Sequence, residues 1–387
     1  MYKLLVITNG LAVGGAEKQT VSLLNGLSQK GFDIVLMSLD SNCRLKSSLA
    51  KEIDTEILNK RSFFDLGALR KIRNRIRDFT PEFILLENSY SMLFGFIARW
   101  QSHSRARMIM VNHTTIIDTP KERFQNILYS RIMNRMDSLV YVCENQRSYW
   151  VGKYKLKSAI TEVIHNGIDL EWFSSYGGIG NGNNGSGGIG DGNRDGDIDR
   201  SAFREKLGFA DNDIVVGISA NLRPVKRHQD LIAAAALLVP SLPIKLLFIG
   251  DGPQRAFLQE YASQKGLRER LTITGMVDDV RPYMKCIDIF ALTSVSETFS
   301  MAALEAMAMR KPAILSNVGG ASELVESGVN GFLYPAGDAG ALAGCIRQTT
   351  ESGRMNEMGQ ASFEKVKASF IRENMIEKYI RLMNRLI

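Results

Sequence analysis

Cysteine is scarce in this sequence, and long apolar runs are missing. The four cysteines, Cys43, Cys143, Cys286 and Cys345, lie far apart and form no CxxC pair. This spacing argues against a zinc site and against a disulfide framework, and it favours a reducing cytoplasm. The longest unbroken apolar stretch is Leu231–Val239. It is much shorter than the ~20 residues that a membrane-spanning helix needs.

Two further signatures are absent. The N-terminus has too short an apolar run for a secretory signal, and no small-residue cleavage site follows it, so we expect a buried first strand there. A nicotinamide-binding domain needs GxGxxG after a strand, with an acidic residue about 20 positions later. Neither Gly10–Gly15 nor Gly250–Pro253 fits this pattern. The missing glycine pattern argues against a nicotinamide-dependent oxidoreductase.

The composition is that of a globular protein with an uneven charge distribution. The 387 residues are 45% hydrophobic and 23% charged, which suggests two domains. Residues 1–160 carry 24 Lys and Arg against 14 Asp and Glu, whereas the remainder carries 24 against 27. A basic N-terminal half suits a polyanion, a lipid diphosphate or an anionic membrane surface. No recognisable motif supports nucleic-acid binding.

The most basic segment, Lys60–Arg77, has a second interpretation. It can be an ordinary surface helix whose buried stripe is Leu66, Leu69, Ile72, Ile76 and Phe79. The apolar run Tyr90–Trp100 is equally ambiguous. It can face a lipid-linked glycan at the inner face of a membrane, or it can be a core helix behind a sheet.

Short apolar runs alternate with amphipathic stretches such as Glu17–Lys30 and Lys121–Met136. The expected strands are Leu4–Thr8, Asp33–Ser38, Phe83–Leu86, Met108–Val111 and Ser138–Val142, followed by Ile214–Ser219, Lys245–Ile249, Leu271–Thr274, Ile287–Leu292, Ala313–Ser316 and Gly331–Tyr334. Nearly continuous apolar strands between helices are typical of parallel sheets covered on both faces. The rhythm therefore predicts two doubly wound, Rossmann-like α/β domains in tandem.

Between the two halves lies a segment rich in Gly, Asn and Asp, residues 177–199, which we expect to be a flexible surface loop. Its acidic run Asp195–Asp199 superficially resembles a calcium loop. Calcium loops need a glycine at the sixth position and a glutamate at the twelfth. Arg200 and Lys206 occupy these positions, so we expect no metal site here.

Two acidic residues, Glu297 and Glu305, flank the expected start of a helix within Ser296–Ala308. If Glu297 lies in the turn and Glu305 on the helix, they are separated by roughly 12 Å along the axis, about the length of a nucleotide diphosphate. The free amides and positive dipole end of a helix N-terminus suit a diphosphate. An ordinary helix with two solvated glutamates is the alternative.

A second cluster lies in Gly217–His228, where a buried strand delivers several cations to its carboxyl end. Open α/β sheets bind ligands at this edge. Arginine offers a planar fork to phosphate and lysine a point charge, so the cluster suits a departing diphosphate. A solvated basic turn is the alternative.

The order of these motifs resembles that of the family 4 retaining glycosyltransferases of the GT-B fold, along nearly the whole chain. The motifs are Gly14–Glu17, His165–Asp169, Asn221–Lys226, Ile249–Pro253, Thr274–Val277, the Glu297 and Glu305 pair, Gly319–Glu323 and Asn330–Leu333. The resemblance implies an N-terminal acceptor-binding domain at 1–165 and a nucleotide-sugar-binding domain at 166–370, facing each other across a cleft. It also implies a final helix at 371–387 that packs back on the first domain.

The resemblance also implies roles for single residues. Glu297 would contact donor-sugar hydroxyls, with His113 facing the same sugar, and Glu305 would bind the ribose. Lys226 and Arg223 would lie beside the diphosphate. The remaining donor-site residues would be Gly14, Gly15, Gly275, Met276, Val277, Thr298, Phe299, Ser300 and Met301.

Two departures from the family pattern matter. Asn221 stands where an arginine is usual, and we expect Arg223 to supply the charge; Thr298 stands where glycine is frequent. The implied chemistry is metal-free transfer with retention from a UDP- or GDP-sugar to an envelope or exopolysaccharide glycan, free or lipid-linked. We expect a cytoplasmic protein, and peripheral contact with an anionic membrane at the inner face is the alternative location. A sugar-nucleotide epimerase and a non-catalytic partner subunit remain alternatives.

Overall fold

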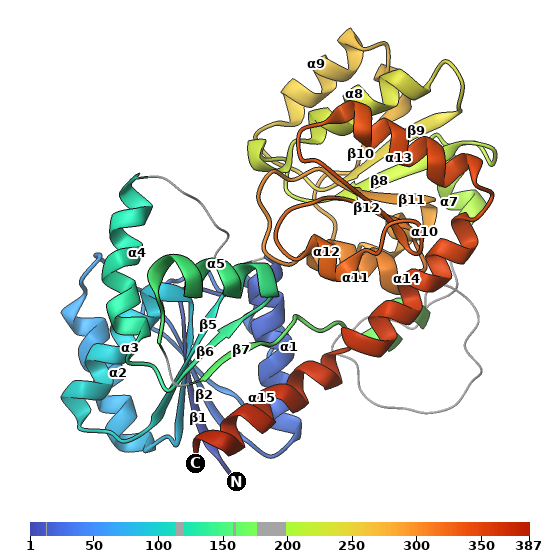
Figure 1. Ribbon diagram of the computed structural model, residues 1–387. Coiled ribbons are helices and arrows are strands. Elements are labelled where there is room, and N and C mark those ends of the chain that lie inside the picture. Colours follow the sequence, from blue (N-terminus) through green and yellow to red (C-terminus); the bar gives the residue numbers. More distant parts are fainter. Residues whose placement is uncertain (13, 114–119, 158–159, 176–198) are drawn as a thin grey trace. The chain divides into compact units, whose positions relative to one another are not determined.

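The computed structural model describes residues 1–12, 14–113, 120–157, 160–175 and 199–387, which form two compact units (Figure 1). Unit 1 comprises residues 1–167 together with 372–387, and unit 2 comprises residues 168–371. The glycine-rich segment expected as a flexible loop lies, apart from residue 199, outside the described residues.

Unit 1 contains a seven-stranded sheet with the order β3-β2-β1-β4-β5-β6-β7, in which every pairing is parallel. The strands are β1 Lys3–Thr8, β2 Asp33–Ser38, β3 Asp54–Ile57, β4 Phe83–Glu87, β5 Arg107–Asn112, β6 Ser138–Tyr141 and β7 Ile160–Val163. The central strands are buried along nearly their whole length. Burial on both faces explains why their sequences are almost continuously apolar.

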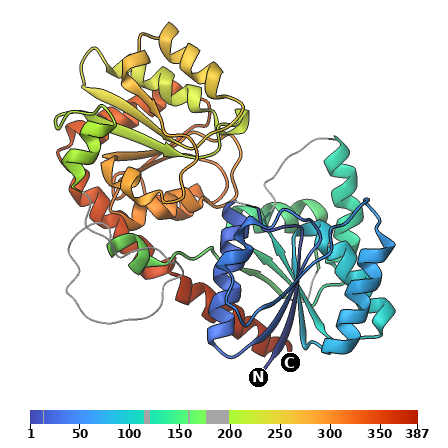
Figure 2. The same cartoon turned by 180° about the vertical axis from the view of Figure 1, so that it is seen from behind.

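Helices cover both faces of this sheet (Figures 1 and 2). They are α1 Gly15–Gln29, α2 Leu66–Phe79, α3 Asn88–Ser102, α4 Pro120–Met133, α5 Glu144–Tyr154 and α15 Arg372–Leu386, with a 3₁₀ turn at Arg44–Ser48. Side chains of α1 and α15 share one core with the sheet, and side chains of α2 to α5 share the other. Unit 1 is therefore a three-layer sandwich.

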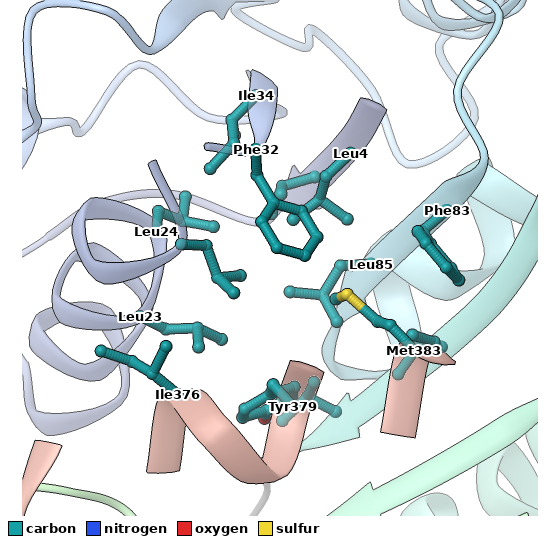
Figure 3. Close-up of a cluster of buried hydrophobic side chains, with 14 of the residues drawn as sticks. Leu4, Leu23, Leu24, Phe32, Ile34, Phe83, Leu85, Ile376, Tyr379 and Met383 are labelled. Carbon is teal, nitrogen blue, oxygen red and sulfur yellow. The ribbon is translucent and has the colours of Figure 1, made fainter. Parts of the chain in front are cut away.

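The last helix, α15, is part of the unit 1 core although residues 168–371 separate it from the rest of that unit. Figure 3 shows Ile376, Tyr379 and Met383 pointing into the cluster formed by the sheet and α1, and all three are buried. On α1, a Cβ at Gly26 would collide with the Ile376 side chain. Glycine at this position permits the close approach of α1 and α15.

Unit 2 contains a six-stranded parallel sheet with the order β10-β9-β8-β11-β12-β13. The strands are β8 Ile214–Ser219, β9 Ile244–Ile249, β10 Leu271–Ile273, β11 Ile289–Leu292, β12 Ala313–Ser316 and β13 Gly331–Tyr334. The helices are α6 Leu170–Ser174, α7 Arg200–Lys206, α8 His228–Leu238, α9 Arg255–Gln264, α10 Arg281–Cys286, α11 Met301–Ala308, α12 Ala321–Leu324, α13 Ala339–Glu351 and α14 Met355–Ser369, with 3₁₀ turns at Pro224–Lys226 and Arg268–Arg270. Helices α8, α9 and α13 share the main core with the strands.

The sequence predicted eleven of these strands and missed two, β3 and β7. Both missed strands form the edges of the unit 1 sheet. Three of the four residues in DTEI and two of the four in ITEV are polar, and no residue of either strand is fully buried. An edge strand is covered on fewer sides and is often polar. A prediction based on runs of apolar residues therefore misses such an edge strand.

The structure corrects one prediction and resolves another in unit 1. Leu66, expected in the buried stripe of α2, is largely exposed, whereas Ala68, Ile72 and Ile76 are buried. The apolar run that begins at Tyr90 is the core helix α3, which packs against the sheet. Among the described residues, no helix is long and apolar enough to cross a membrane.

Candidate functional site

The strand order of unit 2 creates a switch point between β8 and β11. From β8 the chain continues to β9 on one side, whereas β11 pairs with β8 on the other. The loops that follow these two strands are tied together. Thr293 Oγ1 donates to Lys226 O at 2.6 Å, and Val295 N donates to Val225 O at 3.0 Å. Ligands of open α/β sheets bind at such a carboxyl edge.

Lys226 and Glu297 meet at this switch point. Lys226 Nζ lies 2.5 Å from Glu297 Oε2, and Ser294 Oγ donates to the same oxygen at 3.3 Å. The two side chains are 23% and 19% exposed, so they are shielded but still reachable from solvent. The sequence placed both residues in the site but did not predict that they pair.

The helix expected between the two glutamates begins at Met301. Ser300 caps it, because Ser300 Oγ accepts a hydrogen bond from Ala303 N at 3.2 Å. The remaining amides of a first helical turn have no intrahelical acceptor, so they can bind an anion. Thr298, Phe299 and Ser300 are buried. Their backbone groups are therefore better placed than their side chains to bind a ligand.

Phe299 differs from its neighbours because its ring has a structural role. It packs on Phe370 at a centroid distance of 5.5 Å. Glu305 lies in the second turn of the same helix, α11, and is buried. The structure thus places Glu297 in the loop and Glu305 on the helix, the arrangement on which the sequence argument depended.

A close backbone contact fixes the conformation of the Glu297 loop. Gly319 has a φ of +56°, and a Cβ there would overlap the carbonyl oxygens of Glu297 and Thr298. Gly320 N also donates to Thr298 O at 2.7 Å. Only a glycine at position 319 allows the loop after β12 to support the loop after β11 in this way.

The turn Gly275–Val277 follows β10, two strands away from β8. Gly275 has a φ of +78° and forms a bridge with Gly250, and Thr274 Oγ1 donates to Gly275 O at 2.7 Å. The Met276 side chain is 61% exposed. The turn is therefore held by its backbone and presents an apolar side chain, which suits contact with a flat base.

The expected cation cluster after β8 is smaller in the structure. Arg223 is exposed, and within the described residues its side chain has no hydrogen bond or ion pair. Arg227 is engaged by Asp230, with Nε and an Nη donating at 2.6 and 2.8 Å. His228 is fully buried and packs edge-on against Phe248. Burial, and then the neighbouring Lys226, lower the pKa of His228 to about 3, so it is neutral.

In unit 1, Gly14 and Gly15 start helix α1. Gly14 is the N-cap, and the space that a Cβ would take there is occupied by the Glu17 carboxylate. One turn later, the buried Gln19 side chain donates to Gly167 O at 2.7 Å and accepts from Gly167 N at 3.0 Å. The glycine motif is thus next to the residue that anchors the end of the first unit.

His113 lies directly after β5 and contacts the last residue of β4 and the first residue of α3. Its Nε2 is 2.8 Å from Glu87 Oε2, and its backbone N–H donates to Asn88 Oδ1 at 3.0 Å. Asn88 has a φ of +73°, an uncommon conformation for a non-glycine residue. Sequence reasoning missed Glu87, although an acidic residue at the end of an otherwise apolar strand was a usable signal.

Among the described residues, no group of three or more His, Cys, Asp or Glu side chains could hold a metal ion. All four cysteines lie in described segments, and none of them forms a disulfide bond there. The expected absence of a metal cofactor remains a prediction.

Two family models match this chain, one for each half. The model described as Glycosyltransferase Family 4 matches residues 13–172, and the model described as Glycosyl transferases group 1 matches residues 199–365. Solved structures share the fold across the full length. Anabaena Alr3699/HepE in complex with UDP and glucose has a TM-score of 0.83 and 22% identity, with 100% of each chain covered. Sucrose-phosphate synthase from Thermosynechococcus elongatus has a TM-score of 0.81 and 18% identity, covering 100% of this chain and 99% of that one.

The two parallel-sheet units and these neighbours define a GT-B fold. Together with the two family models, they show that the chain belongs to the family 4 type of glycosyltransferases.

Curated relatives match only in part. N-acetyl-alpha-D-glucosaminyl L-malate synthase of Bacillus anthracis is 29% identical over 182 residues, 47% of this chain and 48% of that protein. D-inositol 3-phosphate glycosyltransferase of Streptomyces griseus is 26% identical over 278 residues, 67% of this chain and 57% of that protein. The chain thus spans about half the length of the curated relatives it matches.

Proposed function

We propose that this protein is a retaining, metal-independent glycosyltransferase that uses a UDP- or GDP-sugar as donor. The observation that carries the proposal is the arrangement at the unit 2 switch point. Lys226 and Glu297 pair beside the N-terminus of α11, and Glu305 follows one turn into that helix. A cation, a helix N-terminus and two carboxylates match the parts of a sugar nucleotide.

The proposed roles follow from this chemistry. Glu297 holds hydroxyls of the donor sugar, and Glu305 holds those of the ribose. Lys226 and the first-turn amides of α11 stabilise the negative charge that grows on the departing diphosphate, a purely electrostatic contribution. Arg223 is exposed and has freedom to join them. With these donors in place, the leaving group needs no metal ion.

Retention follows from how the acceptor is activated. The bond from the anomeric carbon to the diphosphate oxygen breaks, and the acceptor oxygen forms its bond on the same face. The departing oxygen takes the acceptor proton, so no protein nucleophile is required. The protein then acts through positioning and charge stabilisation. In unit 1, His113 is the residue that we assign to the sugar.

Structurally related proteins support a uridine donor and an envelope-type acceptor. Anabaena Alr3699/HepE was crystallised with UDP and with UDP-glucose. WaaB is described as a lipopolysaccharide outer core galactosyltransferase. For this chain, we propose a glycan or lipid-linked glycan of envelope or exopolysaccharide biosynthesis as acceptor.

Calorimetric titration with UDP and with GDP, in the presence of a chelator, tests the donor site. We expect one nucleotide to bind, with loss of binding in Glu305→Ala. Glu260→Ala is the control, because Glu260 is also an acidic residue on a unit 2 helix, α9, and is exposed and outside the motifs of the donor site. Failure of both nucleotides to bind the folded wild-type protein would favour a non-catalytic subunit instead.

A further inference from the structure

Three large apolar side chains project from unit 1 within four residues. Phe63, Phe64 and Leu66 are 53%, 62% and 78% exposed, at the start of α2. Single exposed apolar residues are normal on protein surfaces, but adjoining ones mark an interaction site. This group lies after β3, at the carboxyl edge of the sheet, where the His113 and Glu87 pair also lies.

The loop that carries these side chains is held in place. The Asp65 carboxylate accepts hydrogen bonds from Arg61 N at 2.9 Å and Ala68 N at 3.0 Å, and these bonds lower the pKa of Asp65. The Tyr90 hydroxyl donates to Phe63 O, and the rings of Phe63 and Tyr90 are 5.0 Å apart. The exposure of Phe64 and Leu66 therefore belongs to a defined conformation.

Cations surround the apolar tip. Lys60 and Arg61 precede it, and Arg70 and Lys71 follow it on α2. Lys60 Nζ lies 5.1 Å from the centre of the Tyr90 ring, which fixes this charge beside the tip. Asp65 is the single acidic residue within 60–71, and its carboxylate is used by the turn. Aromatic side chains flanked by Lys and Arg are the side chains that anchor proteins at anionic bilayer surfaces.

The neighbouring helix α4 continues the apolar surface. Its residues Phe124, Ile127 and Leu128 are 65%, 49% and 46% exposed. Tyr129 on the same helix and Tyr90 on α3 both pack, partly buried, against the same core cluster. Helices α2, α3 and α4 also share one core. The exposed α4 side chains thus belong to the same helical layer of unit 1 as the loop.

We propose that unit 1 docks on an anionic lipid bilayer through this surface, with Phe64 and Leu66 inserted among the lipids and Arg70 and Lys71 at the headgroups. The sequence suggested Tyr90–Trp100 as the lipid-facing segment, but that segment is the core helix α3, so the docking surface is a different one. The bilayer contact does not depend on the proposed reaction. If that reaction holds, docking here brings a lipid-linked acceptor to the edge that carries His113.

Co-sedimentation with vesicles tests the proposal, using phosphatidylcholine alone and phosphatidylcholine mixed with phosphatidylglycerol. We expect binding to the anionic vesicles that falls steeply between about 0.1 M and about 0.5 M salt. Arg70→Glu with Lys71→Glu should reduce the partition coefficient at least about tenfold. Phe64→Ser with Leu66→Ser should reduce it as well and leave a weaker, salt-sensitive remainder.

Matched controls come from unit 2. Leu237 and Phe257 are 58% and 48% exposed, so changing both to serine removes similar apolar surface elsewhere. Changing the exposed Lys265 and Arg268 to glutamate makes the same change in net charge. We expect both control variants to bind vesicles like wild type.

Three results would overturn the proposal. The first is equal binding to neutral and anionic vesicles, the second is equal loss in the control variants, and the third is a wild-type dimer in solution that Phe64→Ser with Leu66→Ser dissociates. Thermal unfolding and nucleotide titration of each variant separate misfolding, or failure of the donor site, from loss of lipid contact.

Discussion

Lys226 Nζ lies 2.5 Å from Glu297 Oε2, so the two groups assigned to the diphosphate and to the sugar hold each other at the switch point. The pair lies in loops after two different strands, and it is partly shielded from solvent. Each side chain is therefore positioned by the other as well as by its own loop. This relationship predicts that the two residues do not act independently.

Lys226→Ala should lower turnover about 100-fold or more, because the growing charge on the diphosphate loses its cation. Release of nucleoside diphosphate from the donor measures the rate. In the double variant Lys226→Ala with Glu297→Gln, the increase in activation free energy should be smaller than the sum of the two single increases. The reason is that each single change already disrupts the pair. Full additivity would show that the pair has no functional coupling.

The buried pair in unit 1 predicts an effect on stability. His113→Ala leaves the Glu87 carboxylate buried without its partner, which should destabilise unit 1 by about 3 kcal/mol. Adding Glu87→Gln should recover much of this loss, because an amide costs less than a carboxylate to bury without a partner. Thermal unfolding of the three proteins measures the effect. A double variant as unstable as His113→Ala would contradict this account of the pair.

His228 predicts a pH dependence of stability. Burial lowers the pKa of His228 from 6.5 to about 3, so between these values the unfolded chain binds a proton that the folded protein does not. Below pH 6.5 the free energy of unfolding should therefore decrease as the pH is lowered. His228 contributes up to about 1.4 kcal/mol per pH unit to this decrease. Above pH 6.5 the residue is neutral in both states and contributes no slope.

Replacing His228 with leucine should flatten the acid side of the stability curve, measured by denaturant unfolding between about pH 4 and about pH 7. The same slope in wild type and variant would contradict a buried, neutral imidazole.

Gly319→Ala should impair the donor site. A Cβ there would overlap Glu297 O, so the loop that carries Glu297 must move, and we expect weaker nucleotide binding and a rate at least about tenfold lower. Gly353→Ala is the matched control, because Gly353 also has a positive φ, +67°, with no atom within 4 Å of a Cβ. Similar losses in both variants would attribute the effect to backbone strain alone.

The sequence predicted the fold class because buried parallel strands must be apolar on both faces. Strands such as β2 and β12 therefore appear with their observed bounds, Asp33–Ser38 and Ala313–Ser316. The edge strands β3 and β7 escaped because partial exposure allows polar residues. The stripe predicted for α2 was wrong at Leu66, since helical periodicity identifies a face but does not say where the core ends.

For the site, the sequence by itself determined which chemical groups are available at the carboxyl ends of the strands. Charged residues that directly follow an apolar strand can be identified from their order in the chain. Tertiary structure alone decided which of them meet. It paired Lys226 with Glu297 and His113 with Glu87, removed His228 from the cations by burying it, and left Phe64 and Leu66 in solvent. The physical reason is that pairing and burial depend on contacts between segments far apart in the chain, which local composition and spacing do not encode.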